Sequence, residues 1–248
     1  GECLTCHAER SLTMEKKGKT ISLFVDASAY ETSAHAALAC VACHEQFKPD
    51  RIPHARRLAP AACTACHAKE KFVHYERSVH GMAKGTKPAV ACTDCHSKHA
   101  IQHIAEKGVE QKKLFAEQIC AKCHSAIAAT YRASDHGLAL HAGVRGAPTC
   151  IDCHGEHNVV SPTTEGAQTS RKNEASMCLH CHLDDPEVRT RVGPSAGFIS
   201  SYEKSVHARA VQQGNEAAAT CTDCHGSHEM KKGAHPDSKV SQHHIAAT

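Results

Sequence analysis

Large apolar residues are sparse along this chain, and few stretches repeat them at a regular spacing. Residues 112–127 and 202–213 have patterns that predict short helices, and residues 20–25 have the alternation of a short strand. Loops are indicated by Gly85, Pro88, Gly143, Gly146, Pro148, Gly193 and Pro194. The sequence therefore predicts a mostly α and coil fold with little sheet.

The composition is too poor in large apolar residues for an ordinary core. Leu, Ile, Val and Phe number 38 of 248 residues and there is no Trp. That is about 15%, and chains with less than roughly 20% of these residues are usually disordered. Disordered chains also tend to have a high net charge, whereas this chain has a formal net charge of only +3. Something other than side chains should fill the interior. No apolar run is long enough to span a membrane, and we expect any export signal to have been removed before Gly1.

All 16 cysteines occur as C-x-x-C pairs, and a histidine follows each pair directly. The cysteines are Cys3, Cys6, Cys40, Cys43, Cys63, Cys66, Cys92, Cys95, Cys120, Cys123, Cys150, Cys153, Cys178, Cys181, Cys221 and Cys224. The histidines are His7, His44, His67, His96, His124, His154, His182 and His225.

C-x-x-C-H is the attachment motif of c-type haem: two thiols bond to the porphyrin vinyl groups, and the histidine binds the iron as proximal ligand. Zinc sites do not require a histidine at that position, disulfides leave the histidines unexplained, and thioredoxin-like pairs occur once per domain. The sequence thus predicts eight haem c groups, one per 31 residues. They would replace the missing core, so we expect the apoprotein to be largely unfolded.

Bound haem also changes the charge balance. Eight haems bring about 16 propionate charges, which outweigh the formal +3 of the polypeptide. The 29 Lys and Arg residues are therefore expected to pair with propionates or with solvent. We expect no nucleic-acid partner.

A second motif, Tyr-x-x-Ser-x-His or a near variant, occurs once between each odd and even haem motif. Its copies start at Tyr30, Tyr75, Tyr131 and Tyr202. The regular spacing predicts one domain built from four di-haem repeats. They are residues 1–60, 61–117, 118–175 and 176–234, followed by a polar tail at 235–248.

The repeats supply candidates for the sixth, distal iron ligand. His99 lies three residues after His96, on the same side of a helical turn, so it should reach a neighbouring iron rather than its own. Equivalent positions in the repeats complete a set of eight. These candidates are His35, His80, His136 and His207 from the Tyr motifs, and His99, His157, His228 and, more loosely, His54 from trailing positions. The rivals to His54 are His103, His243 and His244.

Other repeated residues have simpler interpretations. The Tyr and Ser of the second motif are expected to pack and to cap a helix. The Asp residues inside three haem motifs either orient a nearby histidine or lie in solvent. They are Asp94, Asp152 and Asp223.

From Cys3 to His228, the eight C-x-x-C-H motifs and the "CxDCHGxH" endings resemble the multihaem c-type cytochromes of bacteria and archaea. The resemblance implies a fold organised around stacked haems. It also implies an exported, periplasmic or extracellular electron carrier without catalytic residues, acting with redox proteins or extracellular acceptors. Octahaem enzymes of that group often have a C-x-x-C-K motif, which is absent here. A reductase of nitrogen or sulfur oxyanions with one open-site haem remains the alternative.

Assembly is a further expectation. The polar tail after the last haem motif contains three histidines. His243 or His244 is a candidate to bind or pack on a haem of another subunit, near Cys3, which would give a head-to-tail filament.

Overall fold

A computed structural model describes residues 2–45, 47, 61–67, 74–86, 88–193 and 196–247, except the side chains of residues 196, 198 and 247. The chain divides into two compact bodies. The N-terminal body contains Gly1–Val73 and Ala83–Lys107, and the C-terminal body contains His74–Met82 and Gly108–Thr248. His54 lies outside the described residues.

The N-terminal body contains short elements and the hairpin of this structure. Its elements are α1 (Leu4–His7), β1 (Thr13–Lys16), β2 (Lys19–Ser22), α2 (Ala27–Glu31), η1 (Cys40–Ala42), η2 (Cys63–Ala65) and α4 (Cys92–His96). The antiparallel strands pair Thr13 with Ser22. Lys17 and Gly18 both have positive φ, which is the geometry of a two-residue type I′ turn.

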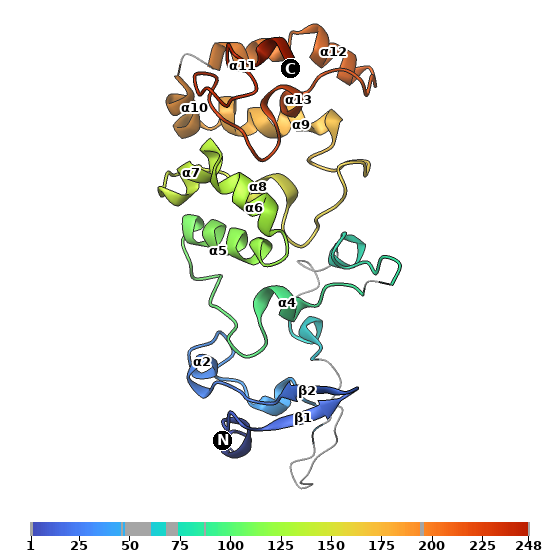
Figure 1. Cartoon of the computed structure of the whole chain (residues 1–248), viewed down its shortest axis with the longest axis vertical. Helices are drawn as coiled ribbons and strands as arrows, with labels where there is room; N and C mark the ends of the chain where they lie inside the picture. Colours follow the sequence, from blue (N-terminus) through green and yellow to red (C-terminus); the bar gives the residue numbers. More distant parts are fainter. Residues whose placement is uncertain are drawn as a thin grey trace. The chain divides into compact units, whose positions relative to one another are not determined.

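The regular elements in the described part of the C-terminal body are all helices, joined by turns and coil. It begins with η3 (Tyr75–Arg77), α5 (Val109–Ala121), α6 (Ser125–Arg132), α7 (Asp135–His141) and α8 (Cys150–His154). It continues with α9 (Arg171–Leu179), the π-helical turn η4 (His180–Asp184), α10 (Pro186–Val192), α11 (Ala196–Tyr202), α12 (Val206–Gln212), α13 (Cys221–His225) and η6 (Ile245–Ala247). Figure 1 shows α5–α8 as one group, and α12 and α13 pack with α9 in another.

The predicted fold class is confirmed at this coarse level, since the described chain is mostly helix and coil with one hairpin. The helix expected at 112–127 is two helices, α5 and α6, which the fifth haem motif separates. The helix expected at 202–213 begins only at Val206, after the Ser205 hydroxyl caps it. No described helix has both the length and the apolar character needed to cross a bilayer.

The side-chain core is small, as the composition predicts. Among the described residues, the buried apolar side chains are five alanines with Tyr131 and Leu140. The chain exposes 17405 Å². A compact protein of 26.6 kDa is expected to expose roughly 11,000 Å², and two separate bodies of these sizes roughly 13,000 Å². The polypeptide therefore leaves several thousand Å² more surface exposed than packed proteins do.

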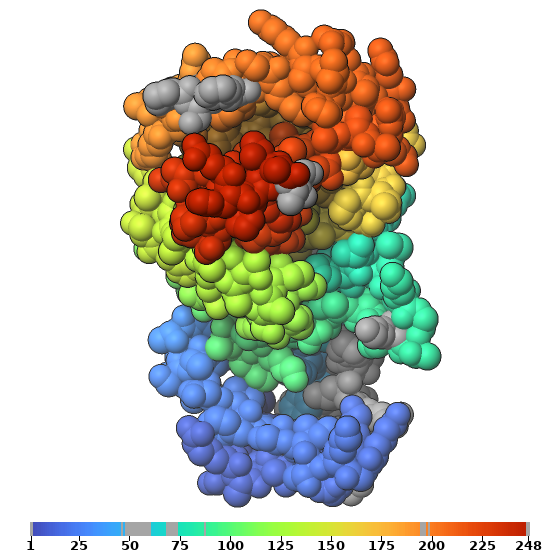
Figure 2. Space-filling model, turned by 45° about the horizontal axis from the view of Figure 1, so that its top comes forward, coloured from blue at the N-terminus to red at the C-terminus, as the bar shows by residue number. Residues whose placement is uncertain are grey.

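The segment after His228 is held by its own chain. Asp135 accepts a hydrogen bond from the Lys232 amide at 2.6 Å, and Lys239 lies 2.8 Å from Glu229. Ser238 and Ser241 are buried. In Figure 2 this red segment lies against the yellow-green surface of the third repeat. These contacts tie the segment to other parts of its own chain.

Candidate haem-binding sites

Three of the four even haem motifs form a single helical turn that their own aspartate caps. The motif aspartate accepts a hydrogen bond from the amide just before the first cysteine, at 2.8, 2.7 and 2.7 Å. Each aspartate thus satisfies the N-terminus of its helix, and Asp94 and Asp223 are also exposed, in line with the solvent-facing alternative. The capped turns are α4 with Asp94, α8 with Asp152 and α13 with Asp223.

The residue after each of these helices turns the chain sharply. Gly155 and Gly226 have φ of 74° and 77° with extended ψ, a conformation nearly restricted to glycine. Ser97 adopts the same conformation in the second repeat, with φ 67°. The turn directs the chain away from the motif histidine toward the trailing histidine.

The Tyr-x-x-Ser-x-His motif is a structural support, as expected. The tyrosine hydroxyl donates to the carbonyl two residues before the even haem motif of its repeat: Tyr131 to Pro148 at 2.5 Å and Tyr202 to Ala219 at 3.0 Å. Tyr30 makes the equivalent bond to Leu38.

The serine of that motif shapes the turn that presents the histidine. In the second and third repeats, its hydroxyl donates to the tyrosine carbonyl at 2.6 and 2.7 Å. It also accepts from the amide three residues later, at 3.0 and 3.2 Å. Ser78 and Ser134 are almost fully buried, so the histidine two residues later has a fixed starting point.

The two haem motifs of each repeat meet at their first cysteines, whose thiols lie close enough to interact. The pairs are Cys3 with Cys40, Cys63 with Cys92, Cys120 with Cys150, and Cys178 with Cys221. None of the 16 cysteines forms a disulfide. The attachment points of two haems would therefore be adjacent within every repeat.

The thiols of the sixth motif show how strongly position affects their ionisation. The hydrogen bond from Cys120 lowers the pKa of Cys150 to about 7, while burial raises the pKa of Cys153 to about 11. Cys153 in turn lies near Cys181 of the seventh motif. The motifs of the third and fourth repeats thus form a continuous series.

Five pairs of histidine rings face each other at nearly constant separation. In each pair, one ring belongs to a haem motif and the other is a predicted distal ligand. The ring centroids are 5.7 to 6.3 Å apart. The pairs are His67 with His35, His44 with His99, His124 with His80, His182 with His136, and His154 with His228.

This separation fits an iron ion between the two rings. An imidazole nitrogen lies about 2 Å from a metal that it binds and about 1 Å from its own ring centre, so two opposed imidazoles have centroids about 6 Å apart. Rings in ordinary aromatic contact span a wider range of about 4.5–7 Å. Ordinary aromatic contact also gives no reason why all five pairs should combine one motif histidine with one histidine from outside the motifs.

Four of the paired rings favour the protonation state that a metal requires. Burial, and secondarily the facing imidazole, lowers the pKa of His80, His99, His136 and His154. A lowered pKa keeps imidazole neutral, which is the form that binds metal. His7 Nδ1 lies 2.8 Å from the Leu23 carbonyl, a bond that leaves Nε2 as the ligating nitrogen.

The pairs connect successive repeats in both directions. A histidine of the Tyr motif faces the first haem motif of the following repeat, as with His136 and His182. A trailing histidine faces the second haem motif of the preceding repeat, as with His228 and His154. A repeat therefore receives its distal histidines from its neighbours and not from itself.

Backbone hydrogen bonds show the same offset. The amide before each of three Tyr-motif histidines donates to the carbonyl two residues after a trailing histidine of the next repeat. These bonds are Ala34 to Ile101 at 2.8 Å, Val79 to Val159 at 2.8 Å and Asp135 to Met230 at 2.9 Å. The offset is therefore a property of the fold as well as of the imidazoles.

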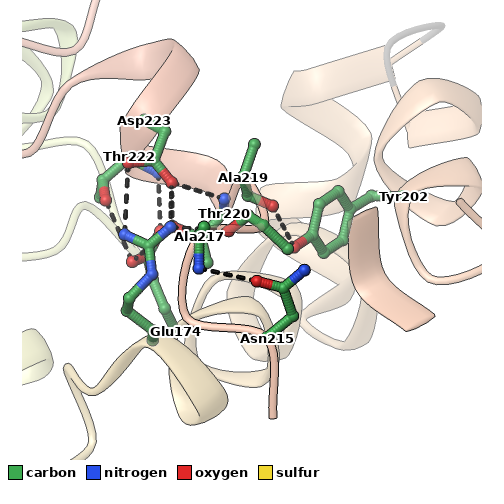
Figure 3. A network of polar contacts seen from close by, with 10 residues as sticks. Glu174, Tyr202, Asn215, Ala217, Ala219, Thr220, Thr222 and Asp223 are labelled. Atoms are coloured by element: carbon green, nitrogen blue, oxygen red, sulfur yellow. Dashed lines mark hydrogen bonds and ion pairs between the residues drawn. The ribbon is translucent and has the colours of Figure 1, made fainter. Parts of the chain in front are cut away.

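Sequence reasoning missed the charged residues that hold the two motifs of a repeat together. Glu174 on α9 is buried and accepts from the Thr222 amide at 2.6 Å, and from the hydroxyls of Thr222 and Thr220 at 3.0 and 3.1 Å (Figure 3). Arg171 on the same helix lies 2.7 Å from Asp223. These bonds fix α9 to α13.

The third repeat has an equivalent ion pair, in which Lys113 lies 3.2 Å from Asp152. Lys113 and Arg171 each precede the first cysteine of an odd motif by seven residues. A basic residue at this position and an aspartate in the following even motif recur in both repeats, and this pattern could have predicted the ion pair from the sequence.

The remaining predicted ligands are placed as follows. His157 Nδ1 lies 3.6 Å from a Glu156 carboxylate oxygen, and His96 ends α4. His207 and His225 are exposed, and so are His243 and His244 of the tail. Among the described residues, no three His, Cys, Asp or Glu side chains form a metal-ion cluster.

Comparison of the chain with protein-family models, curated proteins and solved structures gave no match.

Proposed function

We propose that this chain is an octahaem c-type cytochrome that transfers electrons. The observation that carries the proposal is the set of five facing histidine pairs, each with one motif histidine and centroids 5.7 to 6.3 Å apart. The motif cysteines would attach the haems, and paired imidazoles would hold each iron from both sides. Haem iron supplies one-electron chemistry by alternating between its ferric and ferrous states.

The contribution of the protein is to hold the sites close together and to tune them. Because the first cysteines of the two motifs lie close together, the two haems of a repeat would be attached side by side, and the histidine pairs would link one repeat to the next. Iron with two imidazole ligands has no position for substrate, which favours electron transfer over catalysis. Burial, axial ligands and hydrogen bonds then set the reduction potentials.

The small side-chain core supports the same proposal. The polypeptide exposes at least about 4,000 Å² more than its mass predicts, even with the bodies counted separately. Eight large apolar porphyrins would cover several hundred Å² each, which matches that excess in scale. The fold would then be organised around the haems, within an exported protein that meets redox proteins or extracellular acceptors.

A reductase of nitrogen or sulfur oxyanions is the second candidate function. It is favoured by one observation: His225 of the eighth motif is exposed, and the imidazole known to interact with it, that of His182, already faces His136. An iron there would have a free side for substrate.

The pyridine haemochrome assay and the visible and electron paramagnetic resonance spectra of the holoprotein test the proposal. Electron transfer predicts eight haems that are almost all low-spin and do not turn over nitrite or tetrathionate. Steady reduction of either oxyanion would support the reductase. A holoprotein in which most irons are high-spin would contradict the assignment of paired imidazoles.

A further inference from the structure

The four Tyr motifs differ in the residue that directly follows their histidine. This residue is glycine in the second and third repeats, at Gly81 and Gly137, and alanine in the first and fourth, at Ala36 and Ala208. Neither glycine is among the residues with positive φ, so neither is required for its conformational freedom. The reason for the glycines must therefore be the space around them.

Both glycines lie directly against the carbonyl group of the motif tyrosine. A Cβ atom at Gly137 would overlap the Tyr131 carbonyl and would lie 2.7 Å from the Cα atom of Arg132. A Cβ atom at Gly81 would overlap the Tyr75 carbonyl in the same way. The neighbours are backbone atoms, which cannot move aside as the end of a flexible side chain can. A side chain at either position would therefore push the histidine-bearing turn away from the tyrosine.

The hydroxyl of the motif serine closes this contact in the two glycine repeats. There it donates to the tyrosine carbonyl, at 2.6 Å from Ser78 and at 2.7 Å from Ser134. In the alanine repeats, the hydroxyls of Ser33 and Ser205 accept from amides, and neither donates to its tyrosine carbonyl within the described chain. The turn with glycine is thus tighter than the turn with alanine, because a methyl group would occupy the space that the contact closes.

The tight turn connects the distal histidine to the even haem motif of its own repeat. In the third repeat, the Tyr131 hydroxyl donates to the backbone just before the even motif, and its carbonyl holds the turn from Ser134 to Gly137. His136 lies inside that turn and faces His182 of the next repeat. Ser134 and Gly137 are buried, so the imidazole starts from a backbone with little freedom to move.

We propose that Gly81 and Gly137 are positioning residues that fix the distal imidazoles of the fifth and seventh haems. They directly follow His80 and His136, which face the histidines of these two motifs. The inference rests on the proposed function, because it concerns how tightly a proposed iron ligand is held. The axial ligands contribute to the reduction potential of a haem, so a displaced imidazole changes both the spectrum and the potential of its iron.

The test is the holoprotein of G137A, followed by its ferric resonances and by a redox titration. One haem in eight should change: its low-spin resonance should shift or give way to a high-spin signal, and its reduction potential should move. The other seven should keep their wild-type resonances. G81A should produce the same effect at a different haem.

Gly108 supplies a matched control, because a Cβ atom there meets nothing within 4 Å and its φ is −62°. G108A, which makes the same chemical change in open space, should therefore keep the wild-type spectrum. S134A removes the serine link without adding a side chain, and it should alter the same resonance as G137A. It decides the question if G137A does not mature with eight haems.

Two results would overturn the proposal. One is a G137A protein, or an S134A protein in its place, with eight haems and with wild-type resonances and potentials. Even with a lowered melting temperature, that result would leave the glycine a role in folding only. The other is a G108A protein whose spectrum changes as that of G137A does, since the effect would then not be local to the turn. A wild-type chain without eight haems would instead contradict the proposed function.

Discussion

Replacement of His136 by alanine should open one iron site and leave the other seven unchanged. His136 faces His182 with ring centroids 6.1 Å apart. Ser134 holds the start of its helix, α7, by donating to Tyr131 at 2.7 Å and accepting from Gly137 at 3.2 Å. A methyl group cannot reach the iron, so H136A should lose one of the two ligands at the seventh motif. The expected gain over wild type is the high-spin signal of one haem in eight.

The assay is the ferric high-spin resonance, together with the number of CO molecules that the reduced protein binds. Both should increase by one per chain in H136A, with the haem count still eight. His141 gives a matched control because it lies on the same helix, is 43% exposed and sits 3.8 Å from Glu117 rather than opposite a motif histidine. H141A should leave the spectrum unchanged. An H136A protein with eight haems and the wild-type spectrum would refute the paired-ligand reasoning.

Other predictions concern the supports of the sites. Glu174→Ala leaves the amide and hydroxyl donors of Thr222 without their acceptor and should lower the free energy of unfolding by about 2 kcal/mol, measured by thermal melting; an unchanged melting temperature would refute this. Tyr202→Phe removes one hydrogen bond and should cost about 1 kcal/mol with eight haems retained. Ser97→Gly should raise stability by about 1 kcal/mol, since φ at this position is 67°. Arg171 lowers the pKa of Asp223 to about 2, so this pair stabilises the fold above pH 4 and its contribution is lost as the pH falls toward 2. The free energies of unfolding of wild type and R171Q, measured as the pH is lowered, should therefore converge near pH 2. A difference that stays equally large at pH 2 would contradict this role of the Arg171–Asp223 pair.

The sequence alone supports the prediction of haem motifs and repeats, because covalent haem attachment would fix their spacing. The cysteine and histidine offsets of a motif such as Cys150, Cys153 and His154 do not depend on the rest of the fold. The candidate distal histidines followed from equivalence between repeats. The short hairpin strand near Thr20 was visible from its alternation.

The pairing of each distal histidine was not open to prediction, because it depends on tertiary structure. His99 faces His44, which is 55 residues earlier in the chain and not the nearest motif. The spacing of His96 and His99 indicated only that the two histidines would not bind the same iron. Nothing in one repeat alone indicates that its ligands act on its neighbours, and only the arrangement of successive repeats shows the offset.

The supporting residues were missed for a different reason. A buried carboxylate such as Glu174 looks like any helical glutamate until its surroundings are known. The role of Asp152 depended on recognising the haem motif itself as a helical turn, in which the third residue can cap the preceding amide. The patterns of apolar residues gave no sign of that turn, because cysteines, an aspartate and a histidine fill most of its positions.

Intact mass spectrometry of the denatured holoprotein, matured in a host that attaches c-type haem, tests the central claim most directly. Thioether bonds survive denaturation, so the account predicts one species with the mass of the polypeptide plus eight haems. A polypeptide mass with no added haem, or with zinc or disulfides in place of the thioethers, would contradict it.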